Sequence, residues 1–198
     1  MLCPTKLGPT GTQALNVELQ NLLNPEQKGK PQLQSAARVF RVGDKVMQIK
    51  NNYQIEWEIR TKFGLCVDKG MGIFNGDTGI IEEINDFAET MTISFDEGRK
   101  VEYPFKLLEE LELAYAVTIH KSQGSEYPAV IIPMSQGPRM LMNRNILYTA
   151  VTRARKCVCL VGEEEIFRLM ADNVSESKRY SSLTDRIEEI RHIEDFGQ

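Results

Sequence analysis

The sequence predicts an α/β fold whose parallel sheet is interrupted by an inserted small β-barrel. Two apolar runs, Leu113 to Val117 and Ala129 to Pro133, are short, unalternating and rich in Val, Ile and Ala. This pattern is typical of strands covered on both faces of a parallel sheet. Between residues 37 and 110 the pattern changes to closely spaced short strands with turn signals between them, which favours a small antiparallel barrel. The α/β domain is therefore expected to be discontinuous.

Residues 1–36 are predicted to be the first part of the α/β domain. Leu2-Cys3-Pro4 reads as the end of a strand, and a helix is predicted over residues 11–23, with Pro25 beyond its end. The apolar residues at helical spacing in this helix are Leu15, Leu19, Leu22 and Leu23. Residues 24–35 are rich in Pro, Gln and Lys and are predicted to be a linker.

Residues 37–110 are predicted to form the inserted small β-barrel region. Its predicted strands are Val46 to Ile49, Gly79 to Ile84, Thr90 to Phe95 and Lys100 to Tyr103. Asp96-Glu97-Gly98 between two alternating runs predicts a hairpin. Asn75-Gly76-Asp77 predicts a turn that needs left-handed backbone.

Amide and aromatic side chains gather in the first part of this region. They are Gln48, Asn51, Asn52, Tyr53 and Trp57. Because aromatic faces stack on unpaired bases and amides bond base edges, we expect Asn52 and Tyr53 to contact nucleic acid. Trp57 could equally fill the interface between the barrel and the α/β domain, and both interpretations stay open.

Residues 111–173 are predicted to complete the α/β domain. A polar stretch, residues 118–126 (Thr-Ile-His-Lys-Ser-Gln-Gly-Ser-Glu), stands between the two apolar runs and therefore at the carboxyl end of a strand. Ligands bind at that edge of an open α/β sheet. The stretch carries hydroxyl, imidazole, ammonium and amide groups suited to phosphate and sugar oxygens. The alternative is a solvated turn with a helix cap at Ser122 or Ser125.

A second polar segment, Asn143 to Lys156, follows this stretch. Its apolar residues 146, 147, 150 and 151 share one helix face, with Asn143 as the cap. Residues 157–162 then read as a buried strand, and Glu163-Glu164-Glu165 opens a helix that ends near Asn173. Residues 174–198 are a polar tail with one amphipathic stretch.

Charge is unevenly distributed along the chain. The net charge is −4, yet residues 117–156 hold six Lys or Arg and a single acid, Glu126. Such a positive strip on an acidic body can guide one strand of nucleic acid, although it could also be a solvated helix face. The four cysteines, Cys3, Cys66, Cys157 and Cys159, lack metal-ligand spacing and are predicted to be buried small hydrophobes.

The composition is that of an ordinary globular protein. No apolar stretch approaches membrane-spanning length, and Met1 is not followed by a basic and then apolar leader. The expected compartment is the cytoplasm, with no membrane partner.

Both polar segments resemble known helicase motifs. TIHKSQGSEY (residues 118–127) and NRNILYTAVTRARK (residues 143–156) resemble motifs V and VI of superfamily 1 helicases, in the RecD-like branch that includes the alpha subunit of exodeoxyribonuclease V and its stand-alone relatives. CPTKLGPTGTQALNVELQNLLNP, VGDKVMQIKNNY and IFNGDTGII are similar to other parts of such helicases. The resemblance implies a second RecA-like motor domain, of the P-loop NTPase type, with an inserted SH3-like barrel.

The resemblance also implies roles for individual residues. Arg153 would be the arginine finger that reaches the γ-phosphate of ATP. The expected nucleotide-binding residues are Gly124, Glu126 and Lys6. The expected DNA-binding residues of the motif are Thr118, His120, Lys121, Ser122 and Gln123, with Ser122 and Gln123 bridging the two ligands. Translocation would run from 5′ to 3′ on single-stranded DNA.

Two features expected of a complete motor are absent from the sequence. It contains no Gly-x-x-x-x-Gly-Lys-Ser/Thr phosphate loop and no apolar strand that ends in an Asp-Glu pair. We therefore expect the carboxy-terminal part of an ATP-dependent DNA helicase, inactive alone, whose missing amino-terminal motor domain completes the site for ATP and Mg²⁺. The expected partners are that domain, single-stranded DNA and, in a nuclease complex, further subunits. A stand-alone nucleic-acid-binding module and a subunit-interaction domain are the alternatives.

Overall fold

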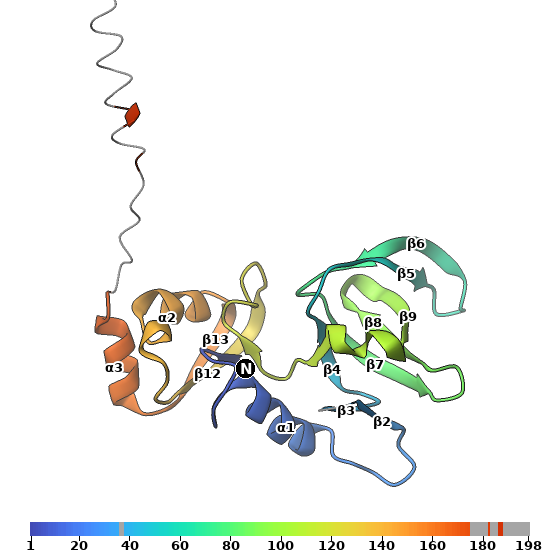
Figure 1. The fold of residues 1–198 in the computed structure, drawn as a ribbon, viewed down its shortest axis with the longest axis horizontal. Coiled ribbons are helices and arrows are strands. Elements are labelled where there is room, and N and C mark those ends of the chain that lie inside the picture. Colours follow the sequence, from blue (N-terminus) through green and yellow to red (C-terminus); the bar gives the residue numbers. More distant parts are fainter. Residues whose placement is uncertain (36–37, 175–181, 183–185, 188–198) are drawn as a thin grey trace, which may run out of the picture.

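The structure is a computed structural model that describes residues 1–35, 38–174, 182, 186 and 187. The ribbon has two halves (Figure 1). One half, called here the parallel half, contains the amino terminus, two helices and short parallel strands. The other, the antiparallel half, is a large antiparallel sheet. Helix α1 (Thr12–Leu23) runs from the parallel half toward the antiparallel one.

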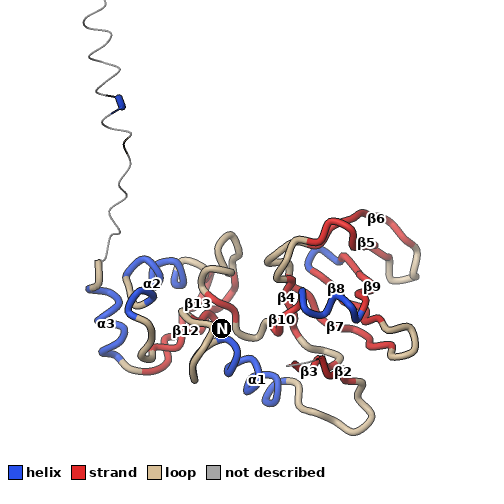
Figure 2. The backbone as a smooth tube through the Cα atoms, viewed as in Figure 1, coloured by secondary structure: helices blue, strands red, loops and turns tan. Residues whose placement is uncertain are grey.

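The parallel half is built from two strand pairs and two helices. Strand β1 (Leu2–Cys3) pairs in parallel with β11 (Val117–Thr118), and β12 (Tyr127–Met134) pairs in parallel with β13 (Ala154–Gly162). Helices α2 (Arg144–Val151) and α3 (Glu164–Asp172) lie beside β12 and β13 (Figure 2). The predicted cap is present, because the Asn143 side chain accepts a hydrogen bond from the Ile146 amide at 3.0 Å. A short 3₁₀ helix, Arg139–Leu141, precedes α2.

The antiparallel half is a seven-stranded sheet in the order β10-β4-β7-β8-β9-β5-β6. Its strands are β4 (Lys45–Gln48), β5 (Asn52–Arg60), β6 (Cys66–Ile73), β7 (Thr78–Asn85), β8 (Thr90–Phe95), β9 (Arg99–Pro104) and β10 (Leu111–Leu113). A separate ribbon pairs β2 (Gln32–Ser35) with β3 (Arg38–Arg41), and 3₁₀ helices span Asp96–Gly98 and Phe105–Glu110. Among the described residues no ladder joins the edge strands β10 and β6, so the sheet is open rather than a closed barrel.

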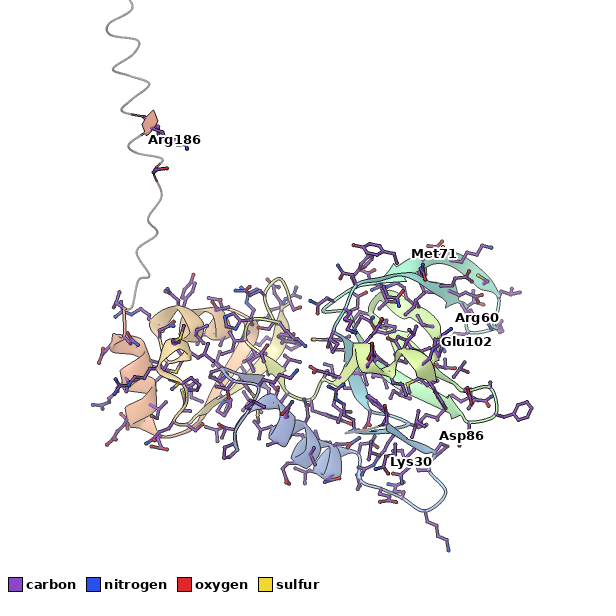
Figure 3. The ribbon with its side chains drawn as sticks, viewed as in Figure 1. Lys30, Arg60, Met71, Asp86, Glu102 and Arg186 are labelled. Carbon is purple, nitrogen blue, oxygen red and sulfur yellow. The ribbon has the colours of Figure 1, made fainter. Side chains whose placement is uncertain are left out.

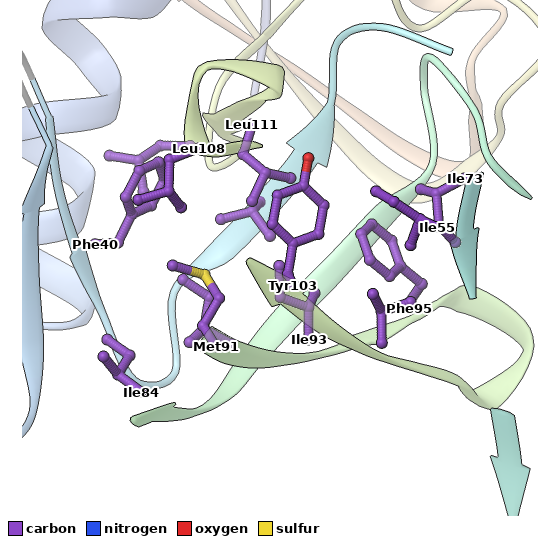
Figure 4. Close-up of a cluster of buried hydrophobic side chains, with 14 residues drawn as sticks. Phe40, Ile55, Ile73, Ile84, Met91, Ile93, Phe95, Tyr103, Leu108 and Leu111 are labelled. Carbon is purple, nitrogen blue, oxygen red and sulfur yellow. The ribbon is translucent and has the colours of Figure 1, made fainter. Parts of the chain in front are cut away.

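Alternate side chains of this sheet point to one core (Figure 4). Its buried members include Phe40, Ile73, Ile81, Met91, Ile93, Tyr103 and Leu111. Trp57 packs against this core. A Cβ on Gly70 of β6 would lie 2.4 Å from the Trp57 ring, so only glycine fits beneath it. Trp57 thus belongs to the core of the antiparallel half, while charged side chains such as Arg60 and Glu102 lie on its outer surface (Figure 3).

The four strands predicted in the antiparallel half are present as β4, β7, β8 and β9. The predicted Asp96-Glu97-Gly98 hairpin is also present, with Glu97 and Gly98 at positive φ. Two predictions nearby are wrong, and one hairpin was missed. Part of the predicted linker forms β2. The run Leu113 to Val117 is not one strand, since Leu113 ends the antiparallel sheet and Val117 begins a parallel strand. The β5–β6 hairpin was not predicted.

The leucines at helical spacing do not form the buried face of α1. Leu22 and Leu23 are exposed, whereas the side chains that the helix buries are polar. They are Thr12, Asn16, Gln20 and, at the helix end, Asn24. The reason is that this face meets backbone carbonyls and a buried carboxylate, described below, and not apolar side chains.

The predicted burial of residues 157–162 is also wrong. Strand β13 is exposed along residues 155–162, because among the described residues it pairs with β12 alone and its other edge stays open. Cys157 and Cys159 on this strand, and Cys66 on β6, are exposed, and only Cys3 is buried as predicted. Burial raises the pKa of the Cys3 thiol to about 11.

The amphipathic stretch predicted in the tail, Leu183 to Ile193, lies outside the described residues except for Arg186 and Ile187. Within the described part of the chain, no helix is both long enough and apolar enough to cross a bilayer.

Candidate functional site

The predicted polar stretch forms a compact turn, called here the 118–126 turn, at the carboxyl end of β11. The Ser122 amide donates to the carbonyls of Thr118 and Ile119, and the Ser125 amide donates to the Ser122 carbonyl at 3.0 Å. Gly124 has a φ of +86°, a backbone conformation that side chains disfavour. The Ile119 amide donates to the Cys3 carbonyl, which ties the turn to β1.

The side chains of the turn divide into exposed and buried groups. His120 and Gln123 are exposed, and Thr118 and Lys121 are half-buried. Ser122 is fully buried, and its hydroxyl donates to the Ile119 carbonyl at 2.7 Å. The expected contact between Ser122 and DNA is therefore not available in this structure. Its hydroxyl shapes the turn, because a buried hydroxyl needs a hydrogen-bond partner.

Arg153 docks on one end of the turn. Arg153 stands two residues beyond the end of α2. Its guanidinium donates to the carbonyls of Ser125 at 3.2 Å and Thr149 at 3.3 Å, and to the Thr152 hydroxyl at 3.4 Å. All of these acceptors are neutral. In the described part of the chain Arg153 makes no ion pair, so its positive charge is not neutralised.

Glu126 is the acid at this end of the turn. Its carboxylate pairs with Arg155, at 2.6 Å. Arg144, which could have approached Glu126, instead donates to the Ala171 carbonyl of α3. Arg155 thus neutralises Glu126, and Arg153 has no carboxylate partner among the described residues.

Glu112 of β10 binds three cations at the other end of the turn. Its carboxylate lies 2.7 Å from Lys6, 3.0 Å from Lys121 and 3.1 Å from Arg38. Burial alone would raise the pKa of the Glu112 carboxyl, but hydrogen bonds and charge from Lys6 and Lys121 hold that pKa below its usual value. Glu112 is therefore ionised at neutral pH. Lys6, expected near the nucleotide, lies beside Lys121, which was expected near DNA.

A groove with a volume of about 540 Å³ adjoins this cluster. One wall is α1, which contributes the amides of Gln13 and Asn21. The opposite wall, from β3 and β10, contributes Arg38 and Glu112, and Lys6 lines the groove as well. Besides Glu112 and apolar residues such as Val17 and Val39, the lining thus includes amides and cations, the groups that bind phosphates and base edges.

A buried carboxylate, Asp44, joins α1 to the antiparallel half. Its oxygens accept hydrogen bonds from Gln20 at 2.5 Å, Asn24 at 2.6 Å, the Arg41 amide at 2.7 Å and the Tyr115 hydroxyl at 2.9 Å. Burial and the charge of Asp44 raise the pKa of Tyr115 to about 12, so the hydroxyl remains a donor at neutral pH.

Asn16, one turn before Gln20 on α1, holds the segment that connects the two sheets. Its amide nitrogen donates to the carbonyls of Leu113 and Ala116, both at 2.9 Å, and its amide oxygen accepts from the Ala116 amide at 2.8 Å. Asp44 and Asn16 together tie α1 to the antiparallel half and to the segment that leads into the 118–126 turn. Neither Glu112 nor Asp44 was identified from the sequence, because a single acid within a strand pattern carries no signal of its partners.

The two DNA-binding candidates in the antiparallel half, Asn52 and Tyr53, differ in whether their side chains are already held by other residues. The Asn52 amide donates to Glu110 at 2.9 Å, and its oxygen accepts from the Gln54 amide. Tyr53 is 68% exposed and meets Phe74 edge to face, with ring centroids 5.5 Å apart. Of these two residues, Tyr53 is the one with a side chain open to a ligand. Both residues lie on β5.

No group of three or more His, Cys, Asp or Glu side chains that could hold a metal ion is found among the described residues. The acids of the site are already paired with Arg or Lys, as Glu126 and Glu112 are. This part of the chain therefore does not fit a magnesium site of its own.

Two family models match the chain. Residues 15–95 match the model of the ATP-dependent RecD-like DNA helicase SH3 domain. Residues 113–161 match the model of the UvrD-like helicase C-terminal domain. The first match covers α1 and much of the antiparallel half, and the second covers the 118–126 turn, α2 and Arg153.

The proteins similar in sequence to the chain include a RecD2 helicase and a RecD subunit. The chain is 33% identical over 187 residues to the ATP-dependent RecD2 DNA helicase of Deinococcus radiodurans, a match that covers 94% of this chain and 23% of that protein. It is 30% identical over 167 residues to the RecBCD enzyme subunit RecD of Mycolicibacterium smegmatis, covering 83% of this chain and 25% of that protein. The chain thus spans about a quarter of the length of these relatives.

The fold is similar to that of a solved helicase. The Bacteroides Pif1 structure bound to single-stranded DNA aligns with 99% of this chain and 45% of that one, with a TM-score of 0.53 at 18% identity. At that identity the likeness concerns the fold alone.

Proposed function

Because the chain belongs to the RecD-like family of DNA helicases, we propose that it is the second motor domain of an ATP-dependent helicase that moves along single-stranded DNA. The observation that carries the proposal is the 118–126 turn, whose two ends present different charged groups. Unpaired Arg153 docks at one end, and the Lys6, Arg38 and Lys121 cluster lies at the other. A motor needs a structural connection between the nucleotide and the DNA strand, and the 118–126 turn would join the two.

On the nucleotide side, we assign Arg153 to the γ-phosphate. A guanidinium held by neutral carbonyls keeps its full charge for the negative charge that develops in the transition state. Gly124 leaves room for the nucleotide, since nothing lies within 4 Å of the position of a Cβ there. Glu126 would bind the ribose, for which its carboxylate must leave Arg155, an exposed partner.

On the strand side, we assign Thr118, His120, Lys121 and Gln123 to the DNA backbone. Ser122 stays buried and transmits movement through the backbone of the turn, in place of the expected direct contact. Lys6 joins the strand side, because it shares Glu112 with Lys121. Tyr53 would stack on a base farther along the strand, whereas Asn52 is held by Glu110.

The rest of the proposal concerns domains and partners. We propose a discontinuous RecA-like domain made of residues 1–36 and 111–173, an SH3-like domain at 37–110 whose sheet is open, and a tail from 174. The amino-terminal motor domain would complete the ATP site and supply its Mg²⁺, for which the described residues offer no ligand cluster. We further propose a cytoplasmic role in recombination or repair, alone or with nuclease subunits.

Strand displacement tests this function. The intact protein that contains this chain is mixed with ATP and a duplex that carries either a 5′ or a 3′ single-stranded tail. We expect ATP-dependent displacement from the 5′-tailed duplex and none from the 3′-tailed one. Binding to the tailed duplexes with no displacement from either would contradict the helicase proposal and favour a binding module.

A further inference from the structure

We propose that Glu112 is a built-in competitor of the DNA backbone: it holds Lys6, Arg38 and Lys121 until a phosphate of the single strand takes its place. The inference rests on the proposed function and adds to it a regulated phosphate site on the strand side. Glu112 belongs to β10 of the antiparallel half, whereas Lys121 belongs to the 118–126 turn. The site is therefore made by both halves of the chain.

The geometry of the cluster is that of a bound anion. Three cations from three separate segments converge on the two oxygens of one carboxylate, at 2.7, 3.0 and 3.1 Å. The carboxylate is 17% exposed, but the cations are more open: Lys6 is 48%, Arg38 35% and Lys121 30% exposed. A phosphate that arrives from solvent can therefore reach the cations without entering the core.

The charge balance favours a further anion. Glu112 offers one negative charge to three positive ones, so the cluster retains an excess of positive charge on a chain whose net charge is −4. Arg41 lines the adjoining groove, and its buried Nε has no hydrogen-bond partner among the described residues. The groove beside α1 also offers amides for the next unit of the strand.

Competition between the Glu112 carboxylate and a phosphate of the strand has two consequences for strand binding. A phosphodiester has to displace the Glu112 carboxylate or tolerate its negative charge nearby, which weakens binding. The Glu112 carboxylate also lowers the number of phosphates that the protein effectively neutralises. This number sets how steeply affinity falls as the salt concentration rises. Removing the charge of Glu112 should change both quantities together.

The test compares Glu112→Gln with wild type in the binding of a fluorescent oligothymidylate, followed by anisotropy at several salt concentrations. Gln keeps the size and hydrogen-bonding oxygen of Glu. We expect the Kd to fall by roughly three- to ten-fold. The slope of log Kd against log salt should steepen by about 0.7, the value for one more phosphate contact on a single strand.

The matched control is Glu109→Gln. Glu109 pairs with Lys50 and is 76% exposed, so this substitution removes the same charge nearby without touching the cluster. We expect its affinity to stay within about two-fold of wild type. Lys6→Gln should weaken binding, and weaken it more in the Glu112→Gln background, where no carboxylate occupies Lys6. Circular dichroism confirms that each variant is folded.

The outcomes separate the two proposals. If wild type binds the strand and Glu112→Gln binds no tighter than Glu109→Gln, the competitor role is refuted while strand binding stands. If no folded variant, wild type included, binds the strand, both the competitor role and the strand side of the proposed function are refuted.

Discussion

Replacing Arg153 with Ala is expected to lower ATP turnover by the intact protein by about 10³- to 10⁵-fold, the value of an arginine finger. The reason is that, among the described residues, the guanidinium contacts only neutral acceptors, the Ser125 and Thr149 carbonyls and the Thr152 hydroxyl, and so keeps its charge for the transition state. Steady-state phosphate release measures turnover, and a fluorescent ATP analogue measures nucleotide binding, which should largely persist.

Two further variants test whether the loss of turnover is specific to the guanidinium of Arg153. Arg153→Lys keeps the charge but loses the guanidinium fork, so most of the loss should remain. Arg168→Ala removes an exposed arginine of α3 that pairs with Glu164, and turnover should not change. An Arg153→Ala protein with wild-type turnover would remove the nucleotide role from this end of the 118–126 turn.

Asp44→Asn is expected to reduce the free energy of unfolding by about 2–4 kcal/mol. The carboxylate is fully buried and accepts hydrogen bonds from Gln20, Asn24, Tyr115 and the Arg41 amide. An Asn amide group would point a donor at donors and leave buried groups unpaired. Urea unfolding followed by circular dichroism measures the change.

Asp86→Asn is the matched control for this prediction. Asp86 is exposed between β7 and β8 (Figure 3), so the same exchange should change the unfolding free energy by less than about 0.5 kcal/mol. Equal stabilities of the two variants would show that Asp44 does not hold the two halves together.

The elements with strong local signals were predictable from the sequence. Strand β8 was predicted with its bounds, since Met91, Ile93 and Phe95 alternate with polar residues. The cap of α2 was found because Asn143 stands just before an apolar helical pattern. The β5–β6 hairpin also had a signal that was missed: Tyr53, Ile55, Trp57 and Ile59 alternate along β5, although the glycines of β6 weaken the pattern of its partner.

Other features depend on contacts that local patterns do not contain. The leucines of α1 predict an apolar buried face, but its amides are buried because Asp44 and the 113–116 backbone, far away in sequence, supply their partners. Strand β13 has a buried-strand composition, and its exposure reflects an open edge. The meeting of Lys6, Arg38 and Lys121 on Glu112 was likewise invisible, because it joins residues up to 106 positions apart.

DNA-stimulated ATP turnover by the intact protein tests the central claim most directly, namely that the 118–126 turn connects the strand to the nucleotide. Phosphate release is measured with and without single-stranded DNA, for wild type and for Lys121→Ala. We expect DNA to stimulate wild type strongly, and Lys121→Ala to need more DNA for the same stimulation while its turnover without DNA is unchanged. Turnover that is the same with and without DNA in wild type would contradict the account.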